Sequence, residues 1–261
     1  MPTKMDRMFS IVTAAAVILL FSICLARVPV HAENTQETVK TDRPVQNPAS
    51  KKPLTSSGLP QPQELVAVMH TGDVAQFDRL LNTGVDPNRV VSPSGKTLLM
   101  AAQSAPMVGL LLNHGADPSI KDNRGATALH HAVMHPDALS IIPLLIEKGA
   151  DINAPAAGLS GETPFLYAKQ LFLQREDAVL GTKVLRLLAK LGADINAADD
   201  DGYTLLTHAV VNDKPDLVGL LVDLGANPRI RTREGQTALD WAEELGFIDI
   251  VELLETARSS N

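Results

Sequence analysis

The chain has 261 residues and a formal net charge of −7; 45% of its residues are apolar but only 3% are aromatic. An acidic chain of this kind lacks the basic surface that attracts nucleic acids and anionic lipids, so we expect no nucleic-acid partner. Its single cysteine, Cys24, lies inside an N-terminal apolar run. The rest of the chain therefore has no thiol for a disulfide, a catalytic thiolate or a cysteine-ligated zinc site.

Residues 1–32 have the three parts of a secretory signal peptide. A basic start with Lys4 and Arg7 is followed by the apolar residues 9–26 and then by a Val-His-Ala triplet that ends at Ala32. This triplet places small residues at the two positions that a signal peptidase reads. We expect cleavage after Ala32 and export of the protein, which would be periplasmic or secreted.

The alternative is an uncleaved anchor, because the apolar stretch of residues 9–26 just reaches the length that spans a membrane. Pro29 and the cleavage site favour removal, so contact with the inner membrane is expected only through this segment if it is retained. Residues 33–60 are rich in Pro, Ser, Thr and Lys and contain no aromatic residue. This composition predicts a disordered linker.

From residue 61 two short phrases recur along the chain. A phrase resembling Gly-Ala-Asp is spaced by 31, 34, 43 and 33 residues and begins at Gly84, Gly115, Gly149, Gly192 and Gly225. A Gly-x-Thr phrase begins at Gly95, Gly125, Gly161, Gly202 and Gly235. Self-similarity near 33 residues predicts a solenoid in which each repeat is one supersecondary unit.

The residues between the two phrases suit a pair of helices. The threonine of Gly-x-Thr can cap a first helix, and the glycine of the other phrase can end a second one in the left-handed conformation. An apolar stripe such as Val108, Leu111 and Leu112 predicts that the second helix packs on one face. Small residues recur where neighbouring first helices must approach closely: Ala102, Ala132, Ala168, Ala209 and Ala242.

These phrases resemble the ankyrin repeat. Residues 122–130 (DNRGATALH) match the family's opening phrase, and residues 144–151 (LLIEKGAD) match its closing phrase. The resemblance covers about residues 61–256. It implies an all-α ankyrin-repeat solenoid of about six stacked helix-turn-helix units with short β-hairpin-like fingers. We place the units at residues 61–90, 91–121, 122–154, 155–198, 199–230 and 231–256, followed by a tail at 257–261.

The fourth unit departs from the pattern. From Thr163 to Gly192 it spans 29 residues, whereas the same interval in the fifth unit, from Thr204 to Gly225, spans 21. We expect the extra residues, within 170–183, to lengthen the first helix and the loop after it. The insertion either lies on a binding face or is neutral variation in a tolerant loop.

The sequence contains no motif of a catalytic nucleophile, a phosphate-binding loop or a zinc hydrolase. His131 and His135 have a spacing that can ligate a metal on a helix, but no Glu or Cys nearby completes the set. His208 is equivalent to His131 two units away, which separates them by about 16–20 Å. The acidic run 199–201 lacks the distal Glu of a calcium loop. We therefore expect no enzyme, no cofactor and no metal.

The resemblance also implies where a partner binds, because ankyrin proteins use the fingertips and the exposed side of the first helices, which line a concave face. The matching positions here are Asn123, Arg124, Ala126, Met134, His135, Asp200, Asp201, Tyr203, Val211, Asn212, Arg233, Glu234 and Gln236. The sign of the charge alternates along this row, which suits one specific protein surface. Tyr203 is either the anchor of the interface or packs on the neighbouring finger.

The sequence thus predicts a non-catalytic scaffold for protein–protein interaction in the bacterial periplasm or envelope, and we expect a monomer. Two alternatives from other classes remain. One is an inhibitor or an immunity- or effector-type protein that blocks a partner enzyme, and the other is a metal-dependent hydrolase.

Overall fold

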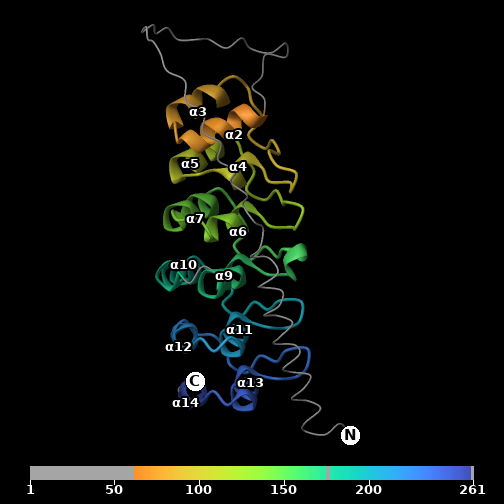
Figure 1. Ribbon diagram of the computed structural model, residues 1–261, viewed down its shortest axis with the longest axis vertical. Coiled ribbons are helices and arrows are strands. Elements are labelled where there is room, and N and C mark those ends of the chain that lie inside the picture. Colours follow the sequence, from red (N-terminus) through yellow and green to blue (C-terminus); the bar gives the residue numbers. More distant parts are fainter. Residues whose placement is uncertain (1–61, 175–176, 260–261) are drawn as a thin grey trace, which may run out of the picture. The chain divides into compact units, whose positions relative to one another are not determined.

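The structure is a computed structural model that describes residues 62–174 and 177–259. The predicted signal peptide, its cleavage site after Ala32 and the predicted linker 33–60 lie outside the described residues. Within the described part, paired helices are stacked in successive layers (Figure 1). The finger loops project to one side of the stack, and the first helix of each pair lies between the fingers and the second helix.

Each unit contributes a first and a second helix. The first helices are α2 (Pro62–Thr71), α4 (Leu98–Ala101), α6 (Ala128–Val133), α8 (Pro164–Tyr167) with α9 (Lys169–Leu173), α11 (Leu205–Val211) and α13 (Ala238–Leu245). The second helices are α3 (Val74–Leu81), α5 (Ala105–Asn113), α7 (Ala138–Glu147), α10 (Ala178–Lys190), α12 (Pro215–Asp223) and α14 (Ile248–Ser259). The six pairs confirm the predicted all-α solenoid.

The fingers are hairpin-like but form no strands within residues 62–174 and 177–259. Isolated antiparallel bridges close three of them, at Val90–Thr97, Ala156–Glu162 and Ala198–Thr204. A short 3-10 turn, η1 (Ala157–Leu159), lies in the finger of the fourth unit. None of the helices in this part of the chain has both the length and the apolar character needed to cross a membrane.

The threonine caps that the sequence predicts are present. In four units the hydroxyl of the threonine accepts the N–H three residues later at 3.2–3.5 Å, as at Thr97, Thr163, Thr204 and Thr237. Each cap satisfies one backbone donor that the first turn of a helix leaves unpaired. In the third unit Nδ1 of His130 accepts the N–H of Thr127 at 3.1 Å and lies 3.0 Å from the Thr127 hydroxyl.

One apolar core runs between the two rows of helices from Leu65 to Leu254. The five small residues predicted at the close approaches of the first helices are all buried: Ala102, Ala132, Ala168, Ala209 and Ala242. Their short side chains let α6 pack on both α4 and α8, and α11 on both α9 and α13. The close stacking of units is therefore set by alanine at one repeated position.

The fourth unit accommodates its extra residues differently from the sequence-based expectation. Its first helix is interrupted at Ala168 and continues as α9, and its second helix, α10, has 13 residues instead of the 9 or 10 of α5, α7 and α12. The longer first helix agrees with the sequence-based expectation, whereas the longer α10 was not expected. Gly181 makes the packing possible, since a Cβ there would lie 2.5 Å from the Phe172 ring.

Backbone hydrogen bonds join each fingertip to the preceding one. The tip N–H groups of Asn123, Gly158, Asp200 and Arg233 donate at 2.8–3.0 Å to the carbonyls of Ser94, Arg124, Ser160 and Asp201 respectively. We call this series the tip ladder. Because each bond links adjacent units, the ladder fixes the spacing of the tips along the stack.

A second series lies where each second helix ends. The side-chain oxygens of Asn88, Asn153 and Asn196 accept a backbone N–H of the next unit at 2.7–2.9 Å. We call this series the asparagine ladder. All three residues stand four positions after the glycine that ends the preceding helix. The second unit has Ser119 at this position, so the asparagine ladder joins the first unit to the second, the third to the fourth and the fourth to the fifth.

Candidate protein-binding surface

Most of the predicted fingertip residues are accessible to a partner. Arg124, Asp200, Asp201, Arg233 and Glu234 are exposed. Arg233 and Asp201 approach to 3.5 Å, but both side chains are about 70% exposed, so this ion pair is weak and both groups can exchange partners. The tips therefore present positive and negative groups in an order that the tip ladder fixes.

Two further tip residues have structural contacts. The side-chain amide of Asn123 donates to the carbonyl of Pro93 at 3.0 Å and so fastens the third tip to the second. Gln236 is half-buried, and its amide donates to Glu244 at 2.7 Å. These residues stay at the surface, but any partner must compete with or add to the contacts that they already make.

Among the residues predicted to lie on the binding surface, only Ala126 is buried. The residue is only 1% exposed; its N–H donates to the Asp122 carboxylate, and its carbonyl accepts the N–H of Asp122 at the base of the finger. The prediction for Ala126 was wrong, since the family pattern gives a position in the finger but not the inward direction of this residue.

The predicted residues on the first helices lie at or near the ends of those helices. Met134, His135 and Val211 are half-buried and Asn212 is exposed. The amide of Asn212 donates to the carbonyl of His208 at 2.8 Å, which completes the end of α11. These four side chains add a half-apolar strip beside the charged tips.

Tyr203 lies in an aromatic cluster that spans two units. Its ring centroid is 5.5 Å from that of His208 and 6.1 Å from that of Trp241 in the next unit. Burial raises the pKa of the Tyr203 phenol, and the negative charges of Glu234, Asp199 and Asp201 raise it further. Tyr203 thus packs on the neighbouring unit and remains half-buried at the surface, so the two interpretations of this residue are compatible.

Two aspartate–histidine pairs lie at the bases of the fingers. Asp122 bonds His131 at 3.0 Å, and Asp199 bonds His208 at 2.8 Å. Burial alone would raise the pKa of both carboxyls, but hydrogen bonds from the histidine and from backbone N–H groups hold it below its ordinary value. The sequence carried a signal for these pairs, namely an Asp and a His nine residues apart in two equivalent places.

We expect the free energy of unfolding to fall as the pH decreases from about 7.5 to about 5.5. Burial lowers the pKa of His130 and His131 below its ordinary value, although bonds to the Glu162 carbonyl and to Asp122 oppose this. The unfolded chain binds protons on these residues near pH ~6.5 whereas the folded chain does not. The stability is therefore fully present above about pH 6.5 and decreases below it.

Urea titrations at the two pH values measure this loss. The variant His130→Gln/His131→Gln keeps hydrogen-bonding groups at both positions but does not titrate, so its stability should change less between them. An equal change in the variant and the original chain would assign the pH dependence to other groups.

A buried charged network that the sequence did not reveal joins the fourth and fifth units. Lys169 in α9 pairs with Glu162 at 2.6 Å, and its Nζ lies 3.1 Å from Nε2 of His208. Glu162 and Lys169 are each 8% exposed. The second carboxylate oxygen of Glu162 is buried without a hydrogen-bond partner among the described residues. This network therefore depends strongly on its single lysine.

The candidate metal ligands do not converge. Nε2 of His131 bonds Asp122, while Nδ1 of His135 accepts the N–H of Asp137 at 2.9 Å. Over residues 62–174 and 177–259, no three or more His, Cys, Asp or Glu side chains gather in a way that could hold a metal ion. His131 and His135 therefore form hydrogen bonds within the protein and do not point toward one common metal position.

Comparison with known proteins agrees with this architecture. A sequence model for ankyrin repeats (3 copies) matches residues 65–156 and 177–259. The chain belongs to the ankyrin-repeat family. Repeats of this family mediate protein–protein interactions, and the fold is typically non-catalytic.

Relatives within the family differ in size. The ankyrin repeat protein YahD of Escherichia coli (strain K12) is 28% identical over 205 residues, which cover 75% of this chain and 96% of YahD. A Danio rerio protein named as a palmitoyltransferase, ZDHHC13, is 30% identical over 154 residues. That match covers 59% of this chain but only 22% of ZDHHC13, so the similarity concerns one part of the larger protein.

Two solved structures have the same fold. The ankyrin repeat domain of Bcl-3, a member of the IkappaB family, has a TM-score of 0.63 at 26% identity and covers 74% of this chain and 81% of its own. The second structure is the endopeptidase Bd0816 of Bdellovibrio bacteriovorus in complex with the immunity protein Bd3460. The matching chain has a TM-score of 0.57 at 30% identity, and the match covers 74% of this chain and 96% of that one.

Proposed function

We propose that the protein is a non-catalytic scaffold that binds a protein partner through its row of fingertips and the adjoining ends of the first helices. The observation that carries this proposal is the tip ladder, which holds exposed groups of both signs at fixed spacing beside the half-buried Tyr203. A rigid row of this kind loses little conformational entropy when a partner docks. Alternating charge selects one partner over others.

We further propose that this scaffold is of bacterial type and is exported to the periplasm or envelope, with residues 1–32 removed. The support is the basic start, the apolar run and the small residues before Ala32. Fractionation of the expressing cells, followed by mass measurement of the purified protein, tests this. A mature protein that begins at Glu33 supports export, whereas an intact N-terminus in the membrane fraction supports the anchored form.

The charge pair Asp200 and Asp201 provides the test of the surface. We expect the variant Asp200→Lys/Asp201→Lys to lose capture of the partner by a tagged protein in envelope extract, because it reverses the charge that these two tip residues present to a partner. The matched control is Glu147→Lys/Asp223→Lys, which changes the net charge equally at exposed positions where α7 and α12 end. Equal capture by the original protein, the Asp200→Lys/Asp201→Lys variant and the control would show that the partner does not bind at this surface.

A second candidate function is inhibition of a partner enzyme. The similarity to one chain of the complex between the endopeptidase Bd0816 and the immunity protein Bd3460 supports it, since the match covers 96% of that chain. If the captured partner is an enzyme, its activity should fall to a minimum at a one-to-one ratio. The remaining alternative, a metal-dependent hydrolase, predicts stoichiometric zinc or iron in the purified protein, and metal analysis tests it directly.

A further inference from the structure

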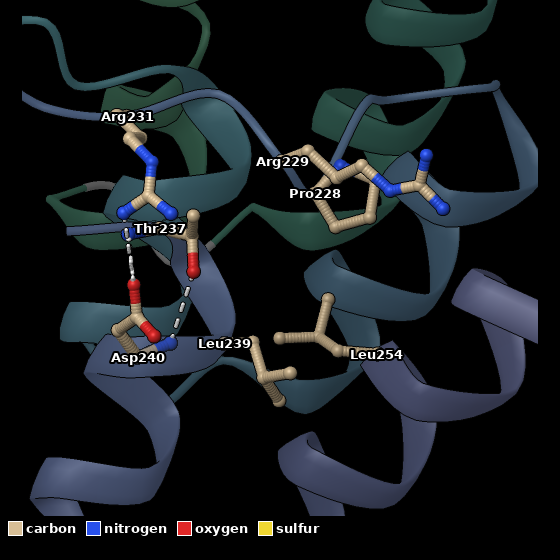
Figure 2. Close-up of a pocket in the computed structure, with 7 residues that line it drawn as sticks. All are labelled: Pro228, Arg229, Arg231, Thr237, Leu239, Asp240 and Leu254. Atoms are coloured by element: carbon tan, nitrogen blue, oxygen red, sulfur yellow. Dashed lines mark hydrogen bonds and ion pairs between the residues drawn. The ribbon is translucent and has the colours of Figure 1, made fainter. Parts of the chain in front are cut away.

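The last unit ends in an open cavity that does not belong to the fingertip row. Its volume is about 480 Å³. Its apolar surface comes from the half-buried Pro228 and Leu239, with the buried Leu254 beneath them, and Arg229, Arg231 and Asp240 line its sides (Figure 2). We call this cavity the terminal slot.

In the third unit, the surface that is equivalent to the slot is covered by the following unit. Leu129 and His130 of the third unit, which are equivalent to Leu239 and Asp240, are 0% and 1% exposed. Nε2 of His130 bonds the carbonyl of Glu162 in the fourth unit at 3.1 Å. In the last unit Leu239 is only half-buried, and the side chain of Asp240 is 48% exposed.

Two hydrogen-bonding groups of the slot differ from those of the asparagine ladder and of the third unit. Arg229 stands four residues after Gly225, the position that Asn88, Asn153 and Asn196 occupy in the asparagine ladder. An arginine side chain only donates, whereas the ladder requires an acceptor. Asp240 offers an acceptor where His130 of the third unit offers a donor, and the second, fourth and fifth units carry Met100, Leu166 and Thr207 at this position. A unit stacked on the slot would therefore find neither the asparagine acceptor of the ladder nor the histidine donor of the third unit.

The charges of the slot favour an anionic group. The Arg229 guanidinium makes no hydrogen bond or ion pair with the described residues. Arg231 bonds the carbonyl of Gly235 and lies 3.7 Å from Asp240, but this pair is exposed, with 65% of the arginine side chain in contact with solvent. Such a pair contributes little and exchanges readily. The residues that line the slot thus include two arginines and one aspartate, and one of the arginines has no partner there.

We propose that the terminal slot binds an acidic segment of a partner protein, in which a carboxylate lies next to an aliphatic side chain. Guanidinium groups bind carboxylates with directional, charge-assisted hydrogen bonds. The half-buried Pro228 and Leu239 can cover the neighbouring aliphatic side chain and remove it from water. A cavity of this volume lies within the range that accepts a few side chains, roughly 300–1,000 Å³. This site is separate from the fingertip surface and does not depend on it.

Fluorescence anisotropy of the protein expressed from the full chain tests the proposal with three labelled peptides. Glu-Leu-Asp-Leu-Glu supplies both chemistries, Gln-Leu-Asn-Leu-Gln lacks the carboxylates, and Glu-Ser-Asp-Ser-Glu lacks the aliphatic groups. We expect the first peptide to bind about tenfold more tightly than either of the others. Equal affinity for all three peptides would overturn the proposal.

The variant Arg229→Glu should weaken binding of Glu-Leu-Asp-Leu-Glu by about tenfold or more, because it replaces an attractive charge with a repulsive one. The matched control is Arg233→Glu, which makes the same charge change at a fingertip outside the slot. Equal weakening by both variants would indicate non-specific charge attraction and overturn the proposal. Methyl NMR shifts confined to Leu239 and Leu254 would place the peptide in the slot.

Two further outcomes distinguish the slot from the fingertip surface and from a dimer interface. The fingertip variant Asp200→Lys/Asp201→Lys should bind the peptide normally, so failure of the proposed function and failure of this inference are distinguishable. Sedimentation of the protein as a dimer that Arg229→Glu converts to a monomer would show that a second copy covers the slot, which would overturn the acidic-segment proposal.

Discussion

Replacement of Lys169 by methionine should lower the free energy of unfolding by about 3–5 kcal/mol, because it leaves the carboxylate of Glu162 buried without a counter-charge. Lys169 is the ion-pair partner of Glu162 at 2.6 Å, and the other carboxylate oxygen already lacks a partner among the described residues. The variant also removes the ammonium group beside Nε2 of His208. Urea unfolding followed by circular dichroism measures the loss.

The control for this prediction is the double variant Glu162→Leu/Lys169→Met. Replacing both members of a buried ion pair by apolar residues of similar size is often neutral or stabilising. We therefore expect the double variant to recover most of the stability that Lys169→Met loses. A single variant that costs under about 1 kcal/mol would instead indicate that water compensates the pair, as it does for exposed ion pairs.

Replacement of Gly202 by alanine should destabilise the stack by cutting the tip ladder between the fifth and sixth units. Gly202 has a φ of 82°, which alone costs a residue with a Cβ about 1–2 kcal/mol. A Cβ would also lie 3.0 Å from the backbone nitrogen of Arg233 and 3.1 Å from Cα of Thr232. Relief of this overlap requires the sixth tip to move, which should cost about 1–3 kcal/mol more.

Gly235 provides a matched control for the Gly202 prediction. It occupies the same position in the last finger with a φ of 85°, but a Cβ there would meet nothing within 4 Å. Gly235→Ala therefore reports the conformational strain alone, and the difference between the two variants reports the contact between tips. Equal losses of unfolding free energy in the two variants would show that the tip contact contributes nothing.

The repeat period was enough to predict the helix pairs, because the same two short phrases mark the start of the first helix and the end of the second helix in most units. Thr97 and its equivalents both cap a helix and mark where it begins, so the two phrases determine the boundaries of each unit. The alanines of the first helices were likewise predictable, since close approach admits only small side chains. The family pattern also placed most fingertip residues at the surface, where Arg124 and Asp200 are found.

The features that sequence reasoning missed depend on contacts between distant residues. Lys169 and His208 are 39 residues apart and meet only because α9 packs on α11. The inward direction of Ala126 depends on a hydrogen bond at the base of its finger. The length of α10 could not be predicted because residues 170–183 suit either a loop or a helix, and packing of Phe172 on Gly181 favours the helix.

The tip ladder passes through the irregular fourth unit without a break. In that unit the N–H of Gly158 donates to the third tip, and the carbonyl of Ser160 accepts the N–H of Asp200 from the fifth. Most of the additional residues of the unit lie between Thr163 and Gly192, in the helical layers behind this connection, and only two lie in its finger. Insertions in the helical layers can therefore accumulate during evolution without changing the spacing of the fingertips that contact another molecule. The helix side and the finger side of the stack are thus free to diverge at different rates.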